Sequence, residues 1–526
     1  MSNIDEAKKR VRAQYGENKK ILDGDYDKSL AVKCVNGTFV GREINGVIAY
    51  KGMPFTGRPP VGEFRWKAPV DVVPDDGVYE AYYNAKSPRQ NESASEEGSL
   101  YFQSEDCLYL DIWKAAGGAA KKPVMVWIHG GAFEMGGTAD PLYECSNFVK
   151  ENPDVIAVSI EYRLNVFGFF HLSHLPDGAD YPDAQNLGLM DQMASLKWIH
   201  ENISNFGGDS DNVTIFGESA GAGSVTLLPL VKGSHEYFQR VIAQSGSPVF
   251  TRSTEQAIAC TNELMEILGC KTVADLQKVD ADKLVEKSAV LSLRVWPERD
   301  GNFLPLDPYA AYANGAAKDI DIIQGCNKDE VNYFVYGFGV EPYNTWGAGR
   351  REMKLAQLTD EEKALVESFC KDIKGESYEH TSRLFDQIVF IAPLFRLSEN
   401  QTSAGGKSYT YYFTPESSLP IMRSGHAVEL STVLNNPQNT IFTGRKFDET
   451  FSKTLRKMWV QFAKTGNPSL SAEISPDSKA KTWPLYDNEN KNVMVFDEFD
   501  IHAEKESARK ILDWERTYFL TKYYCI

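Results

Sequence analysis

The chain has 526 residues and a mass of 58.9 kDa; 42% of the residues are hydrophobic, 12% aromatic and 25% charged. This composition excludes a disordered chain, a collagen-like repeat and a small disulfide-stapled protein. The net charge of −17 argues against a nucleic-acid partner or an anionic membrane surface, because phosphate-rich partners select basic proteins. Area scaling allows about three quarters of the chain's surface to leave water, so we expect a large packed core.

Targeting and redox signals are also informative. The sequence has no run of 18 or more apolar residues, and its first twenty residues lack the apolar centre of a signal peptide. The eight cysteines are scattered without CxxC pairs, and no HExxH or similar ligand spacing occurs. We therefore expect a cytoplasmic protein with reduced thiols that uses neither a metal nor another cofactor and is compatible with a monomer or a homodimer.

The chain begins with a charged, weakly helical stretch, residues 1–30, which we interpret as an N-terminal extension. Residues 31–526 carry no linker or repeat and are expected to form one domain. Dense apolar runs that predict buried strands occur at 107–113, 124–128, 155–160, 213–216, 241–244 and 320–324. Helical patterns lie between several of them, notably over 189–206. This alternation predicts an α/β fold with a mostly parallel central sheet and helices on both faces.

Two later stretches, at about 250–318 and 340–420, lose the regular alternation and become helical, polar and loop-rich. We interpret them as insertions that roof the sheet. Near the end, apolar residues from Phe451 to Phe462 fall at helical spacing, and Gly466 and Pro468 supply a cap and a stop. This pattern predicts a C-terminal helix that packs on the core.

The sequence VTIFGESAGAGS, residues 213–224, places Gly217-Glu218-Ser219-Ala220-Gly221 between a predicted strand and a helix-compatible run. This is the context of a nucleophile elbow, a sharp bend that lifts a serine hydroxyl out of the sheet. The two glycines are required there because a side chain would collide with neighbouring backbone. The bare pattern is weak, since a tight turn with a buried serine would show it as well.

A second glycine motif strengthens the interpretation. Residues 124–137, VMVWIHGGAFEMGG, form another apolar run that leads into His129, Gly130 and Gly131, upstream of the serine. Backbone N–H groups of Gly130, Gly131 and Ala220 would then converge on the oxyanion of an acyl-transfer intermediate. Losing one such donor typically costs about 3 to 4 kcal/mol of transition-state stabilisation. Two motifs in the expected order favour a catalytic site over two unrelated turns.

Serine is a poor nucleophile at neutral pH, so a histidine must accept its proton and a carboxylate must orient that histidine. His426 lies in a loop downstream of the other motifs, which matches the chain order serine, acid, histidine. The stretch DIDIIQGCNKDE ends on Asp329 and Glu330, where a strand's carboxyl end would present them. Either of these two carboxylates satisfies the pattern.

Taken together, these motifs resemble the type-B carboxylesterase and cholinesterase family of α/β-hydrolases. The resemblance covers roughly residues 31–500 and is carried by SEDCLYLDIW (104–113), HGGAF (129–133), EYRLNVFGFF (161–170), NLGLMDQMASLKWI (186–199), GGDSDNVTIFGESAG (207–221), QSGSP (244–248), NKDE (327–330) and FAKTGNPS (462–469). It implies the α/β-hydrolase fold and a serine esterase. It also selects Glu330 over Asp329 as the triad acid and matches His426 to the family's late loop histidine.

The resemblance implies further site residues. Glu218, next to the nucleophile, and Ser245, in QSGSP, would support the triad side chains without being members of the triad. The apolar side chains implied to line the substrate pocket are Phe133, Leu291, Leu293, Val295, Trp296, Tyr333 and Phe334. Each of these seven could equally be an ordinary core residue.

Two departures from the family pattern narrow the expected compartment and the expected substrate class. Cys107 matches a cysteine that is disulfide-bonded in secreted members, but the segment before it offers no partner, and Cys270 similarly lacks one. The missing partners of both cysteines favour a reducing compartment and a microbial intracellular enzyme. The loop 90–103 also lacks the tryptophan that stacks on a quaternary ammonium in cholinesterases, which argues against choline esters as substrates.

We therefore expect a serine hydrolase that cleaves small to medium, largely apolar carboxylic esters through an acyl-enzyme. An amidase, a carbamate hydrolase or an acyltransferase would use the same triad, so these activities remain alternatives. A non-catalytic binding protein is a further alternative, because the family includes members that have lost the triad. Here all three triad positions are occupied.

Overall fold

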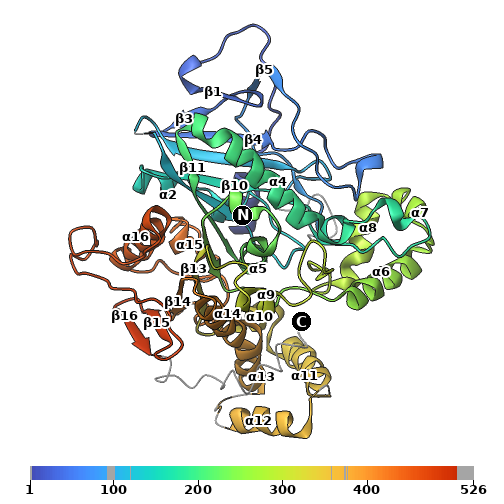
Figure 1. Ribbon diagram of the computed structural model, residues 1–526, viewed down its shortest axis with the longest axis vertical. Coiled ribbons are helices and arrows are strands. Elements are labelled where there is room, and N and C mark those ends of the chain that lie inside the picture. The colour runs from blue at the N-terminus through green and yellow to red at the C-terminus, as the bar shows by residue number, and fades with distance from the viewer. Residues whose placement is uncertain are drawn as a thin grey trace. The chain divides into compact units, whose positions relative to one another are not determined.

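The computed structural model describes residues 3–91, 101–118, 120–356, 358–371, 373, 375 and 377–505 (Figure 1). These residues group into two compact units. The first unit comprises the described residues up to Gly221, together with Val231–Gln239 and Thr251–Leu306. The second comprises Ala222–Leu230, Arg240–Phe250 and the described residues from Asp307 onward.

The largest group of paired strands in the first unit has six members, in the order β3-β4-β8-β10-β9-β11. β9 pairs in parallel with both β10 and β11, whereas the remaining neighbours are antiparallel. Their bounds are β3 (Arg42–Ile44), β4 (Val47–Pro54), β8 (Tyr109–Ala115), β9 (Lys122–Ile128), β10 (Ile156–Ile160) and β11 (Gly208–Glu218). Every residue of β10 is buried, as expected of a parallel strand that is covered on both faces.

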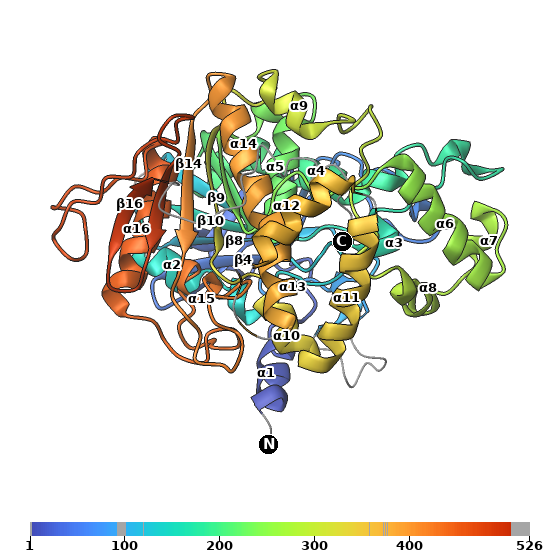
Figure 2. The same ribbon diagram turned by 90° about the horizontal axis from the view of Figure 1, so that it is seen from below.

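Smaller elements complete the first unit. The three-stranded sheet β1-β2-β5 comprises Ala31–Cys34, Asn36–Val40 and Asp75–Glu80, and β6 (Ser87–Pro88) pairs with β7 (Gln103–Ser104). The helices are α1 (Asn3–Arg12), α2 (Ser146–Glu151), α3 (Asn165–Gly168), α4 (Leu187–Asn202), α6 (Thr254–Leu268), α7 (Val273–Gln277) and α8 (Ala281–Ser288). Figures 1 and 2 show α6, α7 and α8 as one group, which lies within the stretch 250–318 that the sequence marks as helical.

The N-terminal extension is packed into the first unit after α1. The Asn18 side chain donates to the carbonyls of Lys51 and Tyr83 at 2.9 and 3.0 Å and accepts from the Tyr82 N–H at 2.8 Å. The hydroxyl groups of Tyr15 and Ser87 lie 3.0 Å apart. The extension is thus tied by hydrogen bonds to residues that sequence analysis placed in the main domain.

The second unit contains the strands β12 to β16 in sequence order. β12, β13, β14 and β15 pair in parallel, and β16 closes the edge antiparallel to β15. Their bounds are β12 (Arg240–Gln244), β13 (Asp321–Asn327), β14 (Ser408–Phe413), β15 (Asn492–Phe496) and β16 (Ile501–Lys505). β14 lies in the stretch 340–420, where the sequence suggests only helices and loops, so this strand was missed.

The helices of the second unit are α9 (Pro308–Ala313), α10 (Asn332–Phe338), α11 (Val340–Ala356), α12 (Asp360–Lys371), α13 (Ser377–Phe385), α14 (Ala392–Ser403), α15 (Leu430–Val433) and α16 (Glu449–Thr465). A π-helix, Asp386–Ile391, joins α13 to α14. Figure 2 shows α10 to α13 together, and α11 contacts both α10 and α13. α16 ends at Gly466, whose φ of 73° provides the left-handed cap predicted from the sequence.

α5 (Ala220–Leu227) begins at the last residues of the first unit and continues into the second. None of the described helices combines the length and the apolar character needed to span a membrane. In the six-stranded group of the first unit β9 is parallel to both of its neighbours and the other pairs are antiparallel, whereas in the second unit only β15 and β16 pair antiparallel. Both units therefore have mixed strand pairing, and the strands of the second unit are mostly parallel, as expected of the fold class.

Candidate active site

Ser219 is the single residue between β11 and α5, and its φ of 56° places it in the left-handed region. A non-glycine residue in this region stores about 1 to 2 kcal/mol of strain, which the surrounding structure must hold in place. A Cβ on Gly217 or Gly221 would clash with the Ile128 carbonyl, so both positions require glycine. The backbone around Ser219 therefore has the sharp strand-turn-helix geometry of a nucleophile elbow.

The glycine loop after β9 lies directly against this elbow. A Cβ on Gly130 would come within 2.7 Å of the Glu218 carbonyl and 3.0 Å of the Ser219 Cβ. Gly131 has a φ of 102°, and the two residues after it also have positive φ values. Ala220, the third predicted oxyanion donor, is buried at the first position of α5. The structure thus brings Gly130 beside the predicted nucleophile within one unit.

His129 holds the start of this loop. Its Nδ1 lies 2.8 Å from the Gly130 carbonyl and its own carbonyl accepts the Tyr162 hydroxyl at 2.9 Å. The imidazole is fully buried and stacks on the Tyr162 ring at 4.6 Å. The Glu161 carboxylate lies 3.6 Å from Nε2 and accepts the Thr138 N–H at 2.8 Å. Because Nδ1 donates to a carbonyl and the ring is enclosed, His129 fixes the loop instead of serving as a general base.

The second unit contains a buried acid–imidazole pair. His426 Nδ1 lies 2.6 Å from Glu330 Oε2, and the His426 N–H donates to the Glu330 carbonyl at 3.0 Å. The other carboxylate oxygen of Glu330 accepts the Asn327 N–H at 2.7 Å. Since a carboxylate can only accept, the proton sits on Nδ1, and Nε2 keeps the lone pair that a general base needs.

The sequence pattern had left Asp329 and Glu330 both possible, and the geometry separates them. Asp329 forms an ion pair with Arg383 at 2.5 Å, and its carboxylate also accepts the Ser424 N–H at 3.4 Å. Glu330 is the carboxylate on His426. The choice that the family resemblance implied is therefore the one that the structure brings to the histidine.

Three aromatic rings surround His426. Tyr333 and Phe334, at the start of α10, have ring centroids 5.8 and 6.0 Å from the imidazole, and Phe334 is stacked on it. Phe390, in the π-helix, lies 5.1 Å away. Phe390 was missed in the sequence, because nothing in DQIVFI distinguishes a π-helix from a buried α-helix. Such bulges occur frequently at functional sites.

Asp386, the first residue of the π-helix, was also missed in the sequence. Its Oδ1 accepts the N–H of Val331, the residue after the acid of the pair, at 2.8 Å, and Arg383 lies 2.9 Å from its Oδ2. Burial raises the pKa of Asp386 to about 7, against the opposing effect of Arg383. Asp386 thus fixes the backbone next to Glu330 while lying in another element.

A buried carboxylate lies behind the pair as well. Glu429 accepts the side-chain amides of Asn327 at 2.7 Å and Gln244 at 3.0 Å. Burial raises the pKa of Glu429, and the nearby charge of Glu330 raises it further. Sequence reasoning missed Glu429, although it follows His426 by three residues.

The predicted supporting residues, Glu218 and Ser245, are both buried. Glu218 ends β11, and its carboxylate would lie 2.9 Å from a Cβ on Gly130. Ser245 follows β12 with a φ of 57° and donates its N–H to the Gly325 carbonyl at 2.8 Å. Among the described residues its hydroxyl has no hydrogen-bond partner, so the structure shows no bond from Ser245 to Glu330.

The remaining predicted pocket residues lie in the first unit. Phe133 follows the glycine loop, is fully buried and packs edge-to-face on Phe169 at 5.1 Å. Leu293 is half-buried, and its N–H donates to the Glu134 carboxylate. Burial raises the pKa of Glu134 to about 7. The other three, Leu291, Val295 and Trp296, are buried.

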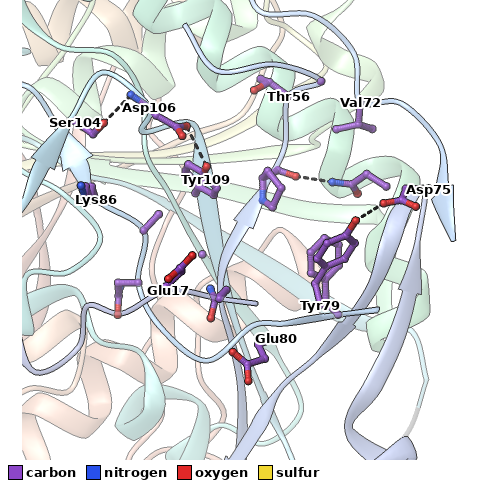
Figure 3. A pocket seen from close by; sticks show the side chains of 18 of the residues that line it. Glu17, Thr56, Val72, Asp75, Tyr79, Glu80, Lys86, Ser104, Asp106 and Tyr109 are labelled. Carbon is purple, nitrogen blue, oxygen red and sulfur yellow. Dashed lines mark hydrogen bonds between the residues drawn. The ribbon is translucent and has the colours of Figure 1, made fainter. Parts of the chain in front are cut away.

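An open pocket of about 740 Å³ lies elsewhere in the first unit, between the N-terminal extension and the small sheet (Figure 3). In it the Tyr109 hydroxyl donates to Asp106 at 3.0 Å, and the Tyr79 hydroxyl contacts Asp75. Its lining includes none of the predicted site residues. Over the described part of the chain, no group of three or more His, Cys, Asp and Glu side chains could hold a metal ion.

A model of the carboxylesterase family matches residues 28–511. The chain belongs to this family. It is 34% identical to the para-nitrobenzyl esterase of Bacillus subtilis over 90% of this chain and 96% of the relative. It is also 30% identical to the acetylcholinesterase of Bungarus fasciatus, over 84% and 77%.

Solved structures agree with these relatives. The Geobacillus stearothermophilus carboxylesterase EST55 superposes with a TM-score of 0.81 at 32% identity, over 93% of this chain and 99% of that one. A para-nitrobenzyl esterase structure gives 0.76 at 30%, over 94% and 100%. The chain is therefore an α/β-hydrolase and a serine carboxylic-ester hydrolase, and these comparisons do not favour the amidase, carbamate hydrolase and acyltransferase alternatives.

Proposed function

We propose that Ser219, His426 and Glu330 are the catalytic triad of this esterase. The observation that carries the proposal is the buried pair in which Glu330 holds His426 Nδ1 at 2.6 Å. Such a pair fixes the tautomer whose Nε2 can take a proton from a serine. The strained elbow at Ser219, with Gly130 packed against it, supplies the matching nucleophile.

In the proposed reaction, Ser219 Oγ attacks the ester carbonyl while His426 Nε2 takes the hydroxyl proton. His426 then gives this proton to the departing alcohol, and an acyl-enzyme remains on Ser219. Water repeats the sequence, with His426 as base, and releases the acid. Glu330 stays ionised throughout and stabilises the imidazolium that forms at each step.

The backbone N–H groups of Gly130, Gly131 and Ala220 would stabilise the oxyanion of each tetrahedral intermediate. Support comes from the bend at Gly131, with a φ of 102°, and from the position of Ala220 at the start of α5. A fixed donor is more effective than water because it needs no reorganisation when the charge appears. His129 and Tyr162 would act indirectly, because they hold the loop that carries these donors.

We propose small to medium, largely apolar esters as substrates, with the natural substrate a small molecule. Aromatic and aliphatic side chains dominate the predicted pocket, and Tyr333 and Phe334 lie against the catalytic imidazole. The name of one relative refers to para-nitrobenzyl esters, an apolar class that fits such walls. A para-nitrobenzyl or short-chain aryl ester is accordingly the first test substrate.

We also propose that the enzyme works in the cytoplasm. The cysteines at 34, 107, 145, 260, 326 and 370 are buried as free thiols, and Cys270 is a half-buried free thiol. Burial raises the pKa of Cys34 to about 12 and that of Cys107 well above its ordinary value. Buried neutral thiols of this kind persist where glutathione and thioredoxin keep the compartment reducing.

Ser219→Ala tests the function. The variant should keep the wild-type far-UV circular dichroism and melting temperature, because Ser219 is half-buried and the substitution removes one oxygen. Hydrolysis of an aryl ester should fall by about 10⁴-fold or more. Turnover within tenfold of wild type would overturn the assignment of Ser219.

A further inference from the structure

A second hydrogen-bonded series of serine, histidine and glutamate side chains lies in the first unit, outside the predicted site. Ser173 Oγ lies 3.1 Å from His171 Nε2, and His171 Nδ1 lies 2.8 Å from Glu298 Oε2. Ser173 is exposed, whereas the exposed fractions of His171 and Glu298 are 7% and 0%. A solvent-accessible hydroxyl is thus connected through an imidazole to a buried carboxylate.

The carboxylate is held firmly from several sides. Glu298 Oε1 accepts the Thr254 hydroxyl at 2.6 Å, which leaves Oε2 for the imidazole. The Asn186 side chain binds both the N–H and the carbonyl of Glu298, at 2.9 Å each. These bonds fix the orientation of Glu298, so the direction in which His171 must point is fixed as well.

The donor and the acceptor of each hydrogen bond between Ser173, His171 and Glu298 can be assigned. The carboxylate can only accept, so His171 Nδ1 carries the proton and Nε2 presents its lone pair. Ser173 must then donate its hydroxyl hydrogen to Nε2. The neighbouring His174, whose ring lies 5.3 Å from His171, has its own partner, because its Nε2 lies 3.0 Å from Asn262 Oδ1. His171 therefore polarises Ser173 in the way that a general base polarises a nucleophile.

We propose that Ser173 is a second, slower nucleophile of this protein, one that reacts covalently with activated acyl and phosphonyl compounds. With a fluorophosphonate, Ser173 Oγ forms a bond to phosphorus, the P–F bond breaks and fluoride leaves. The hydroxyl proton passes to His171 Nε2 and from there to water. Ser173 lies in an exposed turn and not at a strand-to-helix elbow, so the reaction is a single modification without turnover.

The test uses the Ser219→Ala variant, so its outcome does not depend on the triad proposed for Ser219. The variant is incubated with an alkyl fluorophosphonate, and adducts are located by peptide mass spectrometry over time. Ser29 is the internal control, because it is exposed and its hydroxyl donates to Asp27 at 2.6 Å. An adduct should form at Ser173 at least about 100-fold faster than at Ser29, the usual range for general-base assistance.

A second arm adds Glu298→Gln to Ser219→Ala. The nearly isosteric change should slow the Ser173 adduct by about 100-fold or more, because the amide no longer enforces the reactive tautomer of His171. Labelling of Ser173 no faster than that of Ser29 would overturn the proposal. This comparison requires no substitution of His171 or Glu298. A Ser173 rate unchanged by Glu298→Gln, in a protein with the parent melting temperature, would overturn it as well.

Discussion

Each of the two units contains a buried glutamate that holds a histidine by its Nδ1. The distance is 2.6 Å for Glu330 and His426 and 2.8 Å for Glu298 and His171. Both glutamates are fully buried, and each uses its second oxygen for another donor. By the geometry of the acid–imidazole pair alone, the two sites are nearly equivalent.

They differ in what surrounds the pair. His426 is flanked by three aromatic rings, and the nucleophile proposed for it occupies a strained elbow against a glycine loop. His171 faces a polar, exposed turn that includes His174 and Ser173. An oriented base is therefore only one of the parts that an esterase needs. Fixed oxyanion donors and apolar walls convert a reactive serine into one that turns over.

The largest expected effect separates the two acids directly. Glu330→Gln should lower kcat for an aryl ester by about 10⁴-fold, because the amide no longer enforces the reactive tautomer. Glu298→Gln is the matched control and should leave kcat within about threefold. Steady-state kinetics of both variants provides the measurement. Equal losses in the two variants would break the distinction drawn between the two sites.

The glycine loop is the next difference to test. Gly130→Ala introduces a Cβ 2.7 Å from the Glu218 carbonyl, which should displace the loop and lower kcat by about 10²- to 10³-fold. Gly349→Ala is the control, because a Cβ there meets nothing within 4 Å. If Gly130→Ala kept wild-type kcat with an unchanged melting temperature, the loop would have no role in the oxyanion site.

A smaller effect on kcat is expected at Tyr162, which contacts the residue before the glycine loop. Tyr162→Phe removes the hydroxyl that donates to the His129 carbonyl at 2.9 Å. A hydrogen bond of this kind contributes about 1 kcal/mol, so kcat should fall by about fivefold, while labelling of Ser173 by a fluorophosphonate should not change. Tyr336→Phe, at an exposed tyrosine, should alter neither quantity. Parallel losses at both serines would indicate a general loosening of the protein.

The last expected effect concerns the free energy of unfolding and not kcat, and it arises beside Glu330. The native pKa of Asp386 is raised to about 7, whereas an unfolded aspartate titrates near 4, so the native state retains a proton that the unfolded chain releases. Stability should therefore fall as pH rises from about 4 to 7, by at most about 1.4 kcal/mol per pH unit. Asp386→Asn cannot titrate and should lose this contribution. Urea unfolding between pH 5 and 8 measures it, and parallel profiles for the two proteins would contradict the assignment.

Much of the fold could be predicted because six of the buried strands are dense apolar runs. The six predicted strands correspond to β8 to β13. The strand β14, in contrast, reads SYTYYF. Its tyrosines and threonine look polar in sequence, yet all but one of its residues are buried in the structure. Hydropathy alone could not recognise this strand.

The site was predictable where the chemistry is local. The elbow and the glycine loop depend on contiguous residues, so sequence found both. Asp386 and Phe390 act on the His426 pair from a π-helix that has no sequence signature. The sequence did not single out His171, since its partner Glu298 lies 127 residues further along the chain. Contacts between such distant segments follow from the tertiary fold and not from any local pattern.

The most direct measurement is the rate at which a fluorophosphonate adduct forms at Ser219, followed by peptide mass spectrometry in the wild type, Glu330→Gln and His426→Ala. We expect rapid stoichiometric labelling of Ser219 in the wild type and a loss of about 10⁴-fold in the labelling rate in each variant. Unchanged labelling of Ser219 in both folded variants, or a first adduct at a different residue in the wild type, would overturn the proposed triad.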